Sequence, residues 1–148
     1  MRKRISLIII LICGCIGQQV FTLTDITFCM NEPFDRSYEQ NRGATYVQGE
    51  TVWIYFEAFR FETRQEENTF MAVFEMTLEL LDNEGTVILK GAQHLDIPSE
   101  EEPSYLWFKY WIDTRDLEEG VYTVRITALD NLSGESAISE GTFSVVED

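Results

Sequence analysis

Residues 51–59 read Thr-Val-Trp-Ile-Tyr-Phe-Glu-Ala-Phe, and this stretch decides the fold class. Alternate positions carry Val, Ile, Phe and Ala on one side and Trp, Tyr, Glu and Phe on the other. Aromatic and β-branched residues that alternate with period two are typical of a β-strand. A strand in a two-layer sandwich needs only one buried face, but here both faces are largely apolar. The second face therefore needs a cover or a partner.

The segment 70–81 repeats this alternation. Its apolar residues fall at every second position, with Glu75, Thr77 and Glu79 between them. Methionine, glutamate and leucine are good helix formers, but apolar residues on a helix would be spaced three and four apart. The spacing therefore predicts a strand. Residues 82–85, Asp-Asn-Glu-Gly, predict a hairpin turn, because Asn and Gly tolerate positive φ.

The rest of the body continues the same pattern of short strands and polar connections. We expect further strands at 22–29, 86–90, 105–112, 121–129 and 137–146, and loops at 30–45, 61–69 and 91–104. About seven strands, with no convincing helix and no internal repeat, predict an all-β, two-sheet antiparallel sandwich over residues 22–148.

Three passages resemble immunoglobulin-like domains. Leu117 to Tyr122 is similar to the tyrosine corner of fibronectin type III-like domains, in which a tyrosine hydroxyl returns to the upstream backbone. Residues 49–56 and the final pair 128–134 and 143–145 resemble strands of Ig-like domains on prokaryotic surface proteins. The resemblance implies a single Ig-like antiparallel β-sandwich, and it implies no particular ligand.

The first residues of the sequence predict an export signal. Residues 1–4 are basic at three positions, and residues 5–12 form an apolar run. The sequence Ile-Cys-Gly-Cys at 12–15 resembles a prokaryotic lipobox, which implies cleavage before Cys15 and a lipid on its sulfur. We therefore expect a signal peptide at 1–15.

After that signal peptide we expect a tether at 16–21, and a protein anchored to the membrane outside the cytoplasm. Plain secretion and an uncleaved anchor remain alternatives, although a membrane span needs about 20 apolar residues and this run is shorter. A lipid at Cys15 would make the membrane the first expected partner.

The body is strongly acidic. The chain has 26 acids against 11 bases, a net charge of −15. Loss of Arg2, Lys3 and Arg4 with the leader leaves eight bases and a net charge of −18. Such a field repels nucleic acid, so we expect no DNA or RNA partner.

The sequence carries no recognisable catalytic set. Cys29 is the one cysteine of the body and is expected to be a buried apolar side chain, rather than half of an intermolecular disulfide. His94 is the one histidine, expected in a solvated loop beside Asp96. No motif marks a nucleophile, and one histidine with one cysteine falls short of the ligands of a structural zinc site. We expect no enzyme activity, no cofactor and no metal.

The acids leave two minor alternatives open. Paired carboxylates in the runs 66–67, 100–102 and 118–119 could serve a glycosidase-like reaction, but such runs are usually solvated. Calcium binds oxygen-rich loops. Two acidic clusters could offer them, namely Asp113, Asp116, Glu118 and Glu119 at a corner, and Asp130, Asn131, Ser133 and Glu135 at a turn. Neither has EF-hand spacing.

The aromatic side chains are the best candidates for binding. The expected binding face consists of Trp53, Tyr55, Tyr105, Trp107 and Trp111. Exposed apolar patches mark binding sites, and indoles suit protein or sugar partners. Two alternatives remove this site: the loop 30–45 or 91–104 covers the face, or Trp53 and Trp107 turn into the core.

These observations give two main functional hypotheses. The first is a non-catalytic cell-surface lipoprotein with an Ig-like interaction or structural module. The second is a carbohydrate-binding module that uses the Trp/Tyr face. An enzyme built on converging carboxylates is a third and weaker hypothesis.

Overall fold

The computed structural model describes residues 20–148, and this part of the chain is all β, with two sheets and no helix. Within it, no helix is long and apolar enough to span a membrane. The ten strands are β1 (Thr22–Leu23), β2 (Thr27–Cys29), β3 (Thr45–Val47), β4 (Thr51–Phe59), β5 (Arg64–Glu66), β6 (Thr69–Leu81), β7 (Val87–Ser99), β8 (Leu106–Asp113), β9 (Gly120–Asp130) and β10 (Ser136–Val146).

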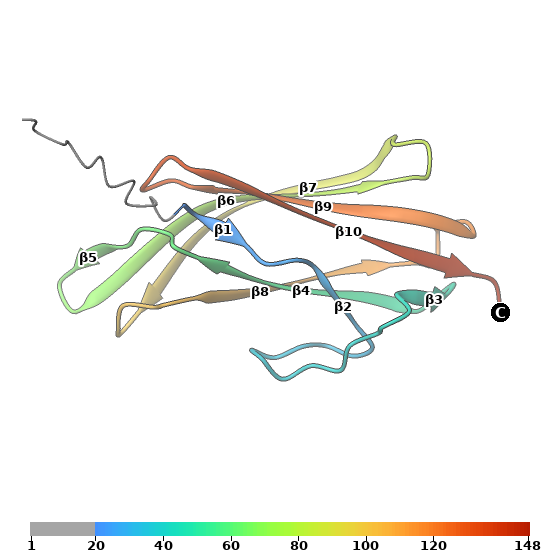
Figure 1. The fold of residues 1–148 in the computed structure, drawn as a ribbon, viewed down its shortest axis with the longest axis horizontal. Helices are drawn as coiled ribbons and strands as arrows, with labels where there is room; N and C mark the ends of the chain where they lie inside the picture. The colour runs from blue at the N-terminus through green and yellow to red at the C-terminus, as the bar shows by residue number, and fades with distance from the viewer. Residues whose placement is uncertain (1–19) are drawn as a thin grey trace, which may run out of the picture.

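The strands form two layers that face each other, as in a β-sandwich (Figure 1). In the smaller sheet, β4 pairs with β8 on one side and with β1 and β2 on the other. In the larger sheet, β9 lies between β10 and β6, and β7 pairs with β6. β3 joins this sheet parallel to β10, while the other pairings are antiparallel.

The aliphatic face of β4 forms the centre of the core. Val52, Ile54 and Phe56 are fully buried, and Phe56 stacks on Phe108 of β8 at 5.3 Å between ring centroids. Phe74 of β6 meets Phe108 edge-on at 5.8 Å. Each such side chain contributes about 1.5–3 kcal/mol by burial. The alternative in which the aliphatic residues face outward is therefore wrong.

The hairpin turn expected at 82–85 is present, and a second tight turn joins β9 to β10. Gly85 has a φ of 80°, and the Asp82 carboxylate accepts the N–H groups of Glu84 and Thr86 at 2.9 Å. Gly134 has a φ of 78° at the β9–β10 turn and donates to the Asp130 carbonyl at 2.8 Å. β6 spans Thr69–Leu81 as a strand, which confirms the two-residue periodicity over the helical interpretation.

The prediction of a long loop at 91–104 is wrong. β7 continues to Ser99 and pairs with β6 along almost its whole length, so His94 lies on a strand. Gly91, Gln93 and Pro98 disguise the alternation in the sequence. Pro98 is tolerated because β7 is an edge strand, where a missing N–H need not break a ladder.

The N-terminal strand expected at 22–29 is divided into β1 and β2. Between them, Thr24 exchanges hydrogen bonds with Glu57 of β4, and its carbonyl accepts the Ser139 hydroxyl of β10 at 2.7 Å. This segment therefore connects the two sheets. Phe21, expected in the tether, is only 3% exposed and stacks on Phe74 at 5.8 Å. Cys15 and the leader lie outside the described residues.

Tyr122 stands near the start of β9, in the position expected for a tyrosine corner. Its hydroxyl donates to the Glu118 carbonyl at 2.6 Å, and its ring stacks on Phe143 at 5.7 Å. Leu117 packs against the core. Cys29 is fully buried, as expected, and burial raises the pKa of its thiol to about 11.

Candidate functional site

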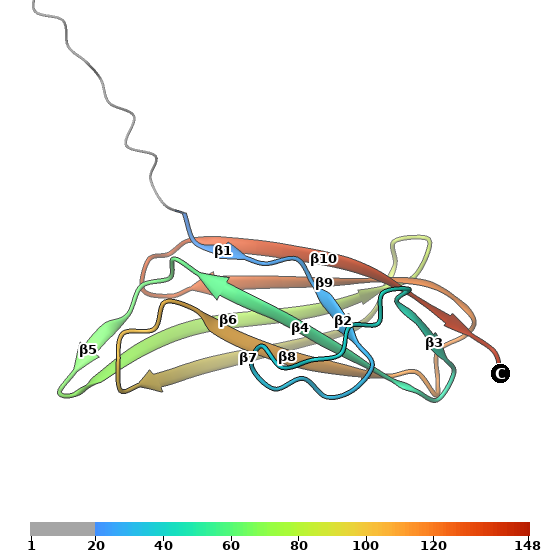
Figure 2. The ribbon, with the colours of Figure 1, turned by 60° about the horizontal axis from the view of Figure 1, so that its bottom comes forward.

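The outer face of β4 and β8 is covered by residues 30–45, which we call the strap. Figure 2 shows this connection between β2 and β3 lying in front of β4 and β8. Phe34 meets Trp107 edge-on at 5.5 Å, and Tyr38 packs on Tyr55 at 4.7 Å. Tyr55 is only 3% exposed as a result. The first alternative, a loop over the aromatic face, is thus confirmed for the strap.

An ion pair holds the strap to β4. Arg36 donates from Nε to Glu57 Oε1 at 2.8 Å and from Nη2 to Oε2 at 3.1 Å. The guanidinium carbon lies 3.9 Å from the centroid of the Tyr105 ring, a cation–π arrangement. The Tyr55 hydroxyl donates to Glu57 Oε1 at 2.7 Å, and the Tyr105 hydroxyl donates to Asp35 at 3.0 Å.

These contacts saturate the polar groups beneath the strap. The bidentate bond from Arg36, together with the Tyr55 hydroxyl, lowers the pKa of the Glu57 carboxyl. Burial and the neighbouring carboxylate raise the pKa of Tyr55. Glu57 is therefore an ionised structural partner at neutral pH, and it is poorly suited to accept or release a proton in a reaction.

The five residues of the expected binding face share one side of the smaller sheet, but they do not form an open platform. Tyr55 is buried, while Trp53, Tyr105 and Trp107 are half-buried. Trp111, whose ring lies 6.0 Å from that of Trp53, is 64% exposed. The strap packs on Tyr55, Tyr105 and Trp107, and Trp111 is the one strongly exposed residue of the five.

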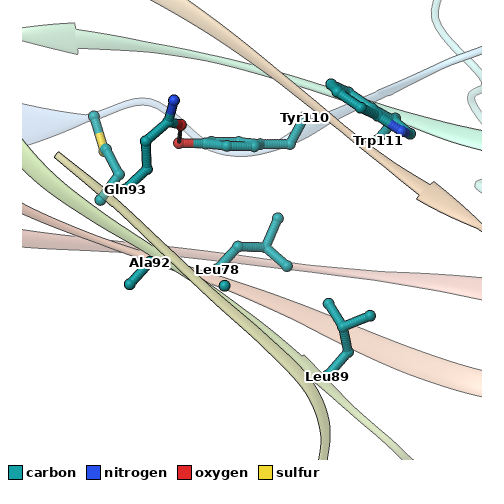
Figure 3. A pocket seen from close by; sticks show the side chains of 8 residues that line it. Leu78, Leu89, Ala92, Gln93, Tyr110 and Trp111 are labelled. Atoms are coloured by element: carbon teal, nitrogen blue, oxygen red, sulfur yellow. Dashed lines mark hydrogen bonds between the residues drawn. The ribbon is translucent and has the colours of Figure 1, made fainter. Parts of the chain in front are cut away.

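Beside Trp111 the sandwich opens into an apolar groove between β7 and β8, which we call the edge groove. It consists of two hollows of about 320 and 460 Å³ that share Leu89 and Trp111. Figure 3 shows Leu78, Leu89 and Ala92 below the first hollow and Tyr110 and Trp111 above it. The lining residues are Met76, Leu78, Leu80, Ile88, Leu89, Gly91, Ala92, Gln93, Tyr110, Trp111, Ile112, Asp113, Asp116 and Leu117.

The edge groove exists because β7 fills the core at Leu95, which lies opposite Phe74, but not farther toward its N-terminal end. The next two residues on this face of β7 are the exposed Gln93, opposite Met76, and Gly91, opposite Leu78. A Cβ added to Gly91 would meet nothing within 4 Å. Leu89, the next residue on this face of β7, is 48% exposed. The hollow therefore lies where a side chain of β7 would otherwise fill the core.

The polar groups of the edge groove lie at its two ends. The Tyr110 hydroxyl points toward Gln93 Oε1 at 3.5 Å (Figure 3). At the other end, Arg115 donates to Asp113 from Nε at 2.8 Å and lowers the pKa of that carboxyl. Asp116 forms no ion pair within residues 20–148. No lysine, arginine or histidine lines either hollow.

The candidate chemical groups outside the groove are engaged in structural contacts. His94 lies on the solvent-exposed face of β7 between the carboxylates of Glu75 and Asp96, with 3.1 Å from Nε2 to Asp96 Oδ1. The hydrogen bond to Glu75 and, as the smaller cause, the hydrogen bond to Asp96 raise the pKa of the imidazole. Nothing in its surroundings resembles a nucleophile with a base.

Each of the two acidic clusters considered for calcium has a carboxylate that is engaged within the fold. The buried Asp130 carboxylate accepts the N–H groups of Leu132 at 3.0 Å and Glu62 at 2.9 Å, and the Ser133 hydroxyl at 2.8 Å. Asp113 is held by Arg115. Residues 20–148 contain no group of three or more His, Cys, Asp or Glu arranged to hold a metal ion.

The comparisons with known proteins add no function. No protein-family model matches the sequence, and no curated protein matches it. A family 123 glycoside hydrolase from Clostridium perfringens is similar over 86% of this chain and 27% of its own, with 10% identity and a TM-score of 0.48. A Bacteroides uniformis β-glucuronidase is similar over 84% of this chain and 14% of its own, with 11% identity and a TM-score of 0.46.

A third solved structure, the alkylpurine DNA glycosylase AlkC of Pseudomonas fluorescens bound to DNA, has 10% identity and a TM-score of 0.45. The similarity covers 84% of this chain and 30% of the glycosylase chain. This chain therefore spans less than a third of each of these larger proteins. At this level of likeness their activities say nothing about this chain.

Proposed function

We propose that this chain is a non-catalytic, exported lipoprotein whose Ig-like module binds a partner through the edge groove. The observation that carries the proposal is the groove itself: an apolar hollow, flanked by the exposed Leu89 and Trp111, between two open strand edges. Apolar concavities of this size with few polar groups are typical binding sites. Exposed apolar surface of this kind favours an interaction over a purely structural role.

The order of the strands supports an Ig-like identity. If β1 and β2 are counted as one interrupted strand, and the short β3 and β5 are left out, one sheet holds the first, second and fifth main strands. These are β1 with β2, then β4 and β8. The other holds the third, fourth, sixth and seventh, namely β6, β7, β9 and β10. Constant-type Ig domains also place the first, second and fifth strands in one sheet and the third, sixth and seventh in the other, but their fourth strand joins the first of these sheets, whereas β7 joins the second one here. The tyrosine corner of such domains enters the sixth strand, where Tyr122 stands.

The membrane anchor rests on the sequence of the leader. Metabolic labelling with a radioactive fatty acid in a bacterial host should place label on the wild-type protein and none on Cys15→Ala. Retention of label by Cys15→Ala would contradict lipidation at that residue. An unlabelled wild-type protein released to the medium would favour plain secretion.

The absence of catalysis is supported by how the titratable side chains are used. Glu57 and Asp130 are buried in hydrogen-bond networks, and His94 is paired with two carboxylates on the opposite face of β7 from the core. None of these groups lines the edge groove. A measured turnover that disappears on mutation of particular carboxylates would contradict the proposal.

The binding role is tested by mapping ligand contacts in solution. Backbone amide spectra of residues 20–148 are recorded against a panel of short peptides and neutral oligosaccharides. The expected shifts concentrate at Leu89, Gly91 and Trp111, and Trp111→Ala weakens binding by at least about tenfold. The matched control is Ile138→Ala on β10, which removes a side chain of similar exposure, 63%. Shifts that map elsewhere would refute the groove as the site.

A carbohydrate-binding module is the second candidate, and the exposed indole of Trp111 favours it. A flat indole can stack on a sugar ring, and Asp116 lies nearby in the groove to accept hydroxyl protons. The strap, however, leaves a single strongly exposed tryptophan instead of a row. Binding of an oligosaccharide that quenches Trp111 fluorescence would favour this candidate.

A further inference from the structure

Resting on the proposed function, we propose that the edge groove takes an extended, cationic peptide segment, which pairs as an added strand with the open edge of β8. Three features carry this: a free sheet edge, two adjoining apolar hollows, and a lining that has carboxylates but no basic residue.

The edge of β8 is available along the groove. β8 pairs with β4 on one side, and no strand within residues 20–148 pairs with its other side. Four consecutive residues of β8, 110–113, line the hollows, whereas the lining run on β7 is interrupted at Lys90. A free edge offers alternating N–H and C=O groups, which an extended peptide can satisfy by strand addition.

The two hollows suit the side chains of such a strand. Side chains at i and i+2 point to the same face and lie roughly 7 Å apart. Two adjoining hollows, separated at Leu89 and Trp111, can therefore receive two successive inward side chains. Apolar side chains of the peptide would occupy the space that Gly91, which has no side chain, leaves open in the hollow. The fitting peptide alternates apolar and polar residues.

The charges around the groove favour a positively charged partner. Asp113 and Asp116 lie at one end of the groove, and the one nearby base, Arg115, forms its ion pair with Asp113. The whole chain adds a net charge of −15. A lysine or arginine of the partner beside Asp116 is therefore attracted, and an acidic partner is repelled.

The experiment uses a synthetic ten-residue peptide of alternating valine and threonine with a lysine at each end, titrated into residues 20–148. Three matched probes accompany it: the same peptide with glutamate at both ends, a version N-methylated at alternate amides, and cellohexaose. Binding is measured by calorimetry at low and high salt, and amide hydrogen exchange locates the contact.

We expect the cationic peptide to bind and to protect alternate amides within residues 110–113. The glutamate peptide should bind at least about tenfold more weakly, and added salt should narrow this difference. Asp116→Asn should also reduce the difference in affinity between the cationic peptide and the glutamate peptide. Gly91→Val, which places an isopropyl group in the open hollow without a strained φ, should weaken binding at least about tenfold, whereas Ile138→Ala should not.

Several results would overturn the inference: equal binding of the N-methylated peptide, equal binding of the glutamate peptide, or protection that falls away from β8. If cellohexaose binds at the groove and no peptide does, the peptide is wrong and the proposed binding role stands. If neither class binds at the groove, the peptide inference fails, and ligands bound at another site would also remove the groove from the proposed function.

Discussion

The strap-covered face and the edge groove are built on the same strand, β8, and differ in how their apolar side chains are covered. Over Trp107, the strap supplies Phe34 and an ion pair that holds the strap down. Around Trp111 no segment of residues 20–148 provides such a cover, and the indole stays 64% exposed. The difference shows that aromatic content on a strand does not define a binding face. The presence or absence of a covering segment does.

The largest effect is expected beneath the strap. Tyr55→Ala removes a ring that is packed between the strap and Trp107 and leaves Glu57 without one hydrogen bond. We expect a loss of about 3–4 kcal/mol in the free energy of unfolding, measured by urea denaturation. Tyr55→Phe, which removes only the hydroxyl, should lose about 1 kcal/mol. A loss below about 1 kcal/mol for Tyr55→Ala would mean that the strap does not close this face.

A smaller effect is expected from the ion pair itself. Glu57→Gln keeps the shape of the side chain but removes its charge opposite Arg36. Because Arg36 is half-exposed and can be hydrated, we expect a loss of about 1–2 kcal/mol at pH 7, less than for a fully buried pair. Arg36→Lys should lose the bidentate geometry and should destabilise the protein less than Glu57→Gln does.

The same pair predicts a pH dependence. The folded pKa of Glu57 is lowered, first by the hydrogen bonds from Arg36. Its stabilisation is therefore complete above the pKa of an unfolded glutamate, about 4.3, and disappears as the pH falls through the lower folded pKa. Wild-type protein and Glu57→Gln should converge in stability on acidification. A constant difference between pH 7 and pH 2 would contradict this assignment.

Filling the edge groove should raise stability slightly. Gly91→Val adds apolar burial and β-propensity at a strand position with open space, so we expect a gain of about 0.5–1 kcal/mol. Ile138→Val on the exposed face of β10 is a control that adds no burial. A loss of stability in Gly91→Val would show that β7 and β8 lie closer together than the groove requires.

The smallest effect is expected at Trp111. Trp111→Ala removes a mainly solvent-exposed ring, and the change in unfolding free energy should stay within about 0.5 kcal/mol, in contrast to Tyr55→Ala. Thermal or urea denaturation measures both variants under the same conditions. A loss of about 2 kcal/mol or more would make Trp111 a structural residue and weaken the case for the groove as a binding site.

The sequence predicts those parts of the fold in which side chains alternate strictly. β4, β6 and β9 were expected within one or two residues, because their buried faces are continuous runs such as Val52, Ile54 and Phe56. β7 was missed beyond Lys90 because Gly91 and Pro98 interrupt the pattern on an edge strand. The short strands β3 and β5 are defined by pairing partners rather than by their own residues.

The candidate site was predictable only in part. Trp111 was among the expected binding residues, and the covering role of the strap was one of two alternatives. The edge groove depends on Gly91 standing opposite Leu78, and this register is a property of paired strands rather than of either segment. The bond from Arg36 to Glu57 links residues 21 positions apart, across a loop without periodicity.

The most direct test of this account compares the solvent access of the three tryptophans. Protein labelled with 5-fluorotryptophan gives one fluorine resonance for each of Trp53, Trp107 and Trp111, assigned by single Trp→Phe variants. With a soluble paramagnetic reagent, the Trp111 resonance should broaden strongly, while Trp53 and Trp107 broaden weakly. Equal broadening of all three resonances would contradict a covered aromatic face beside an open groove.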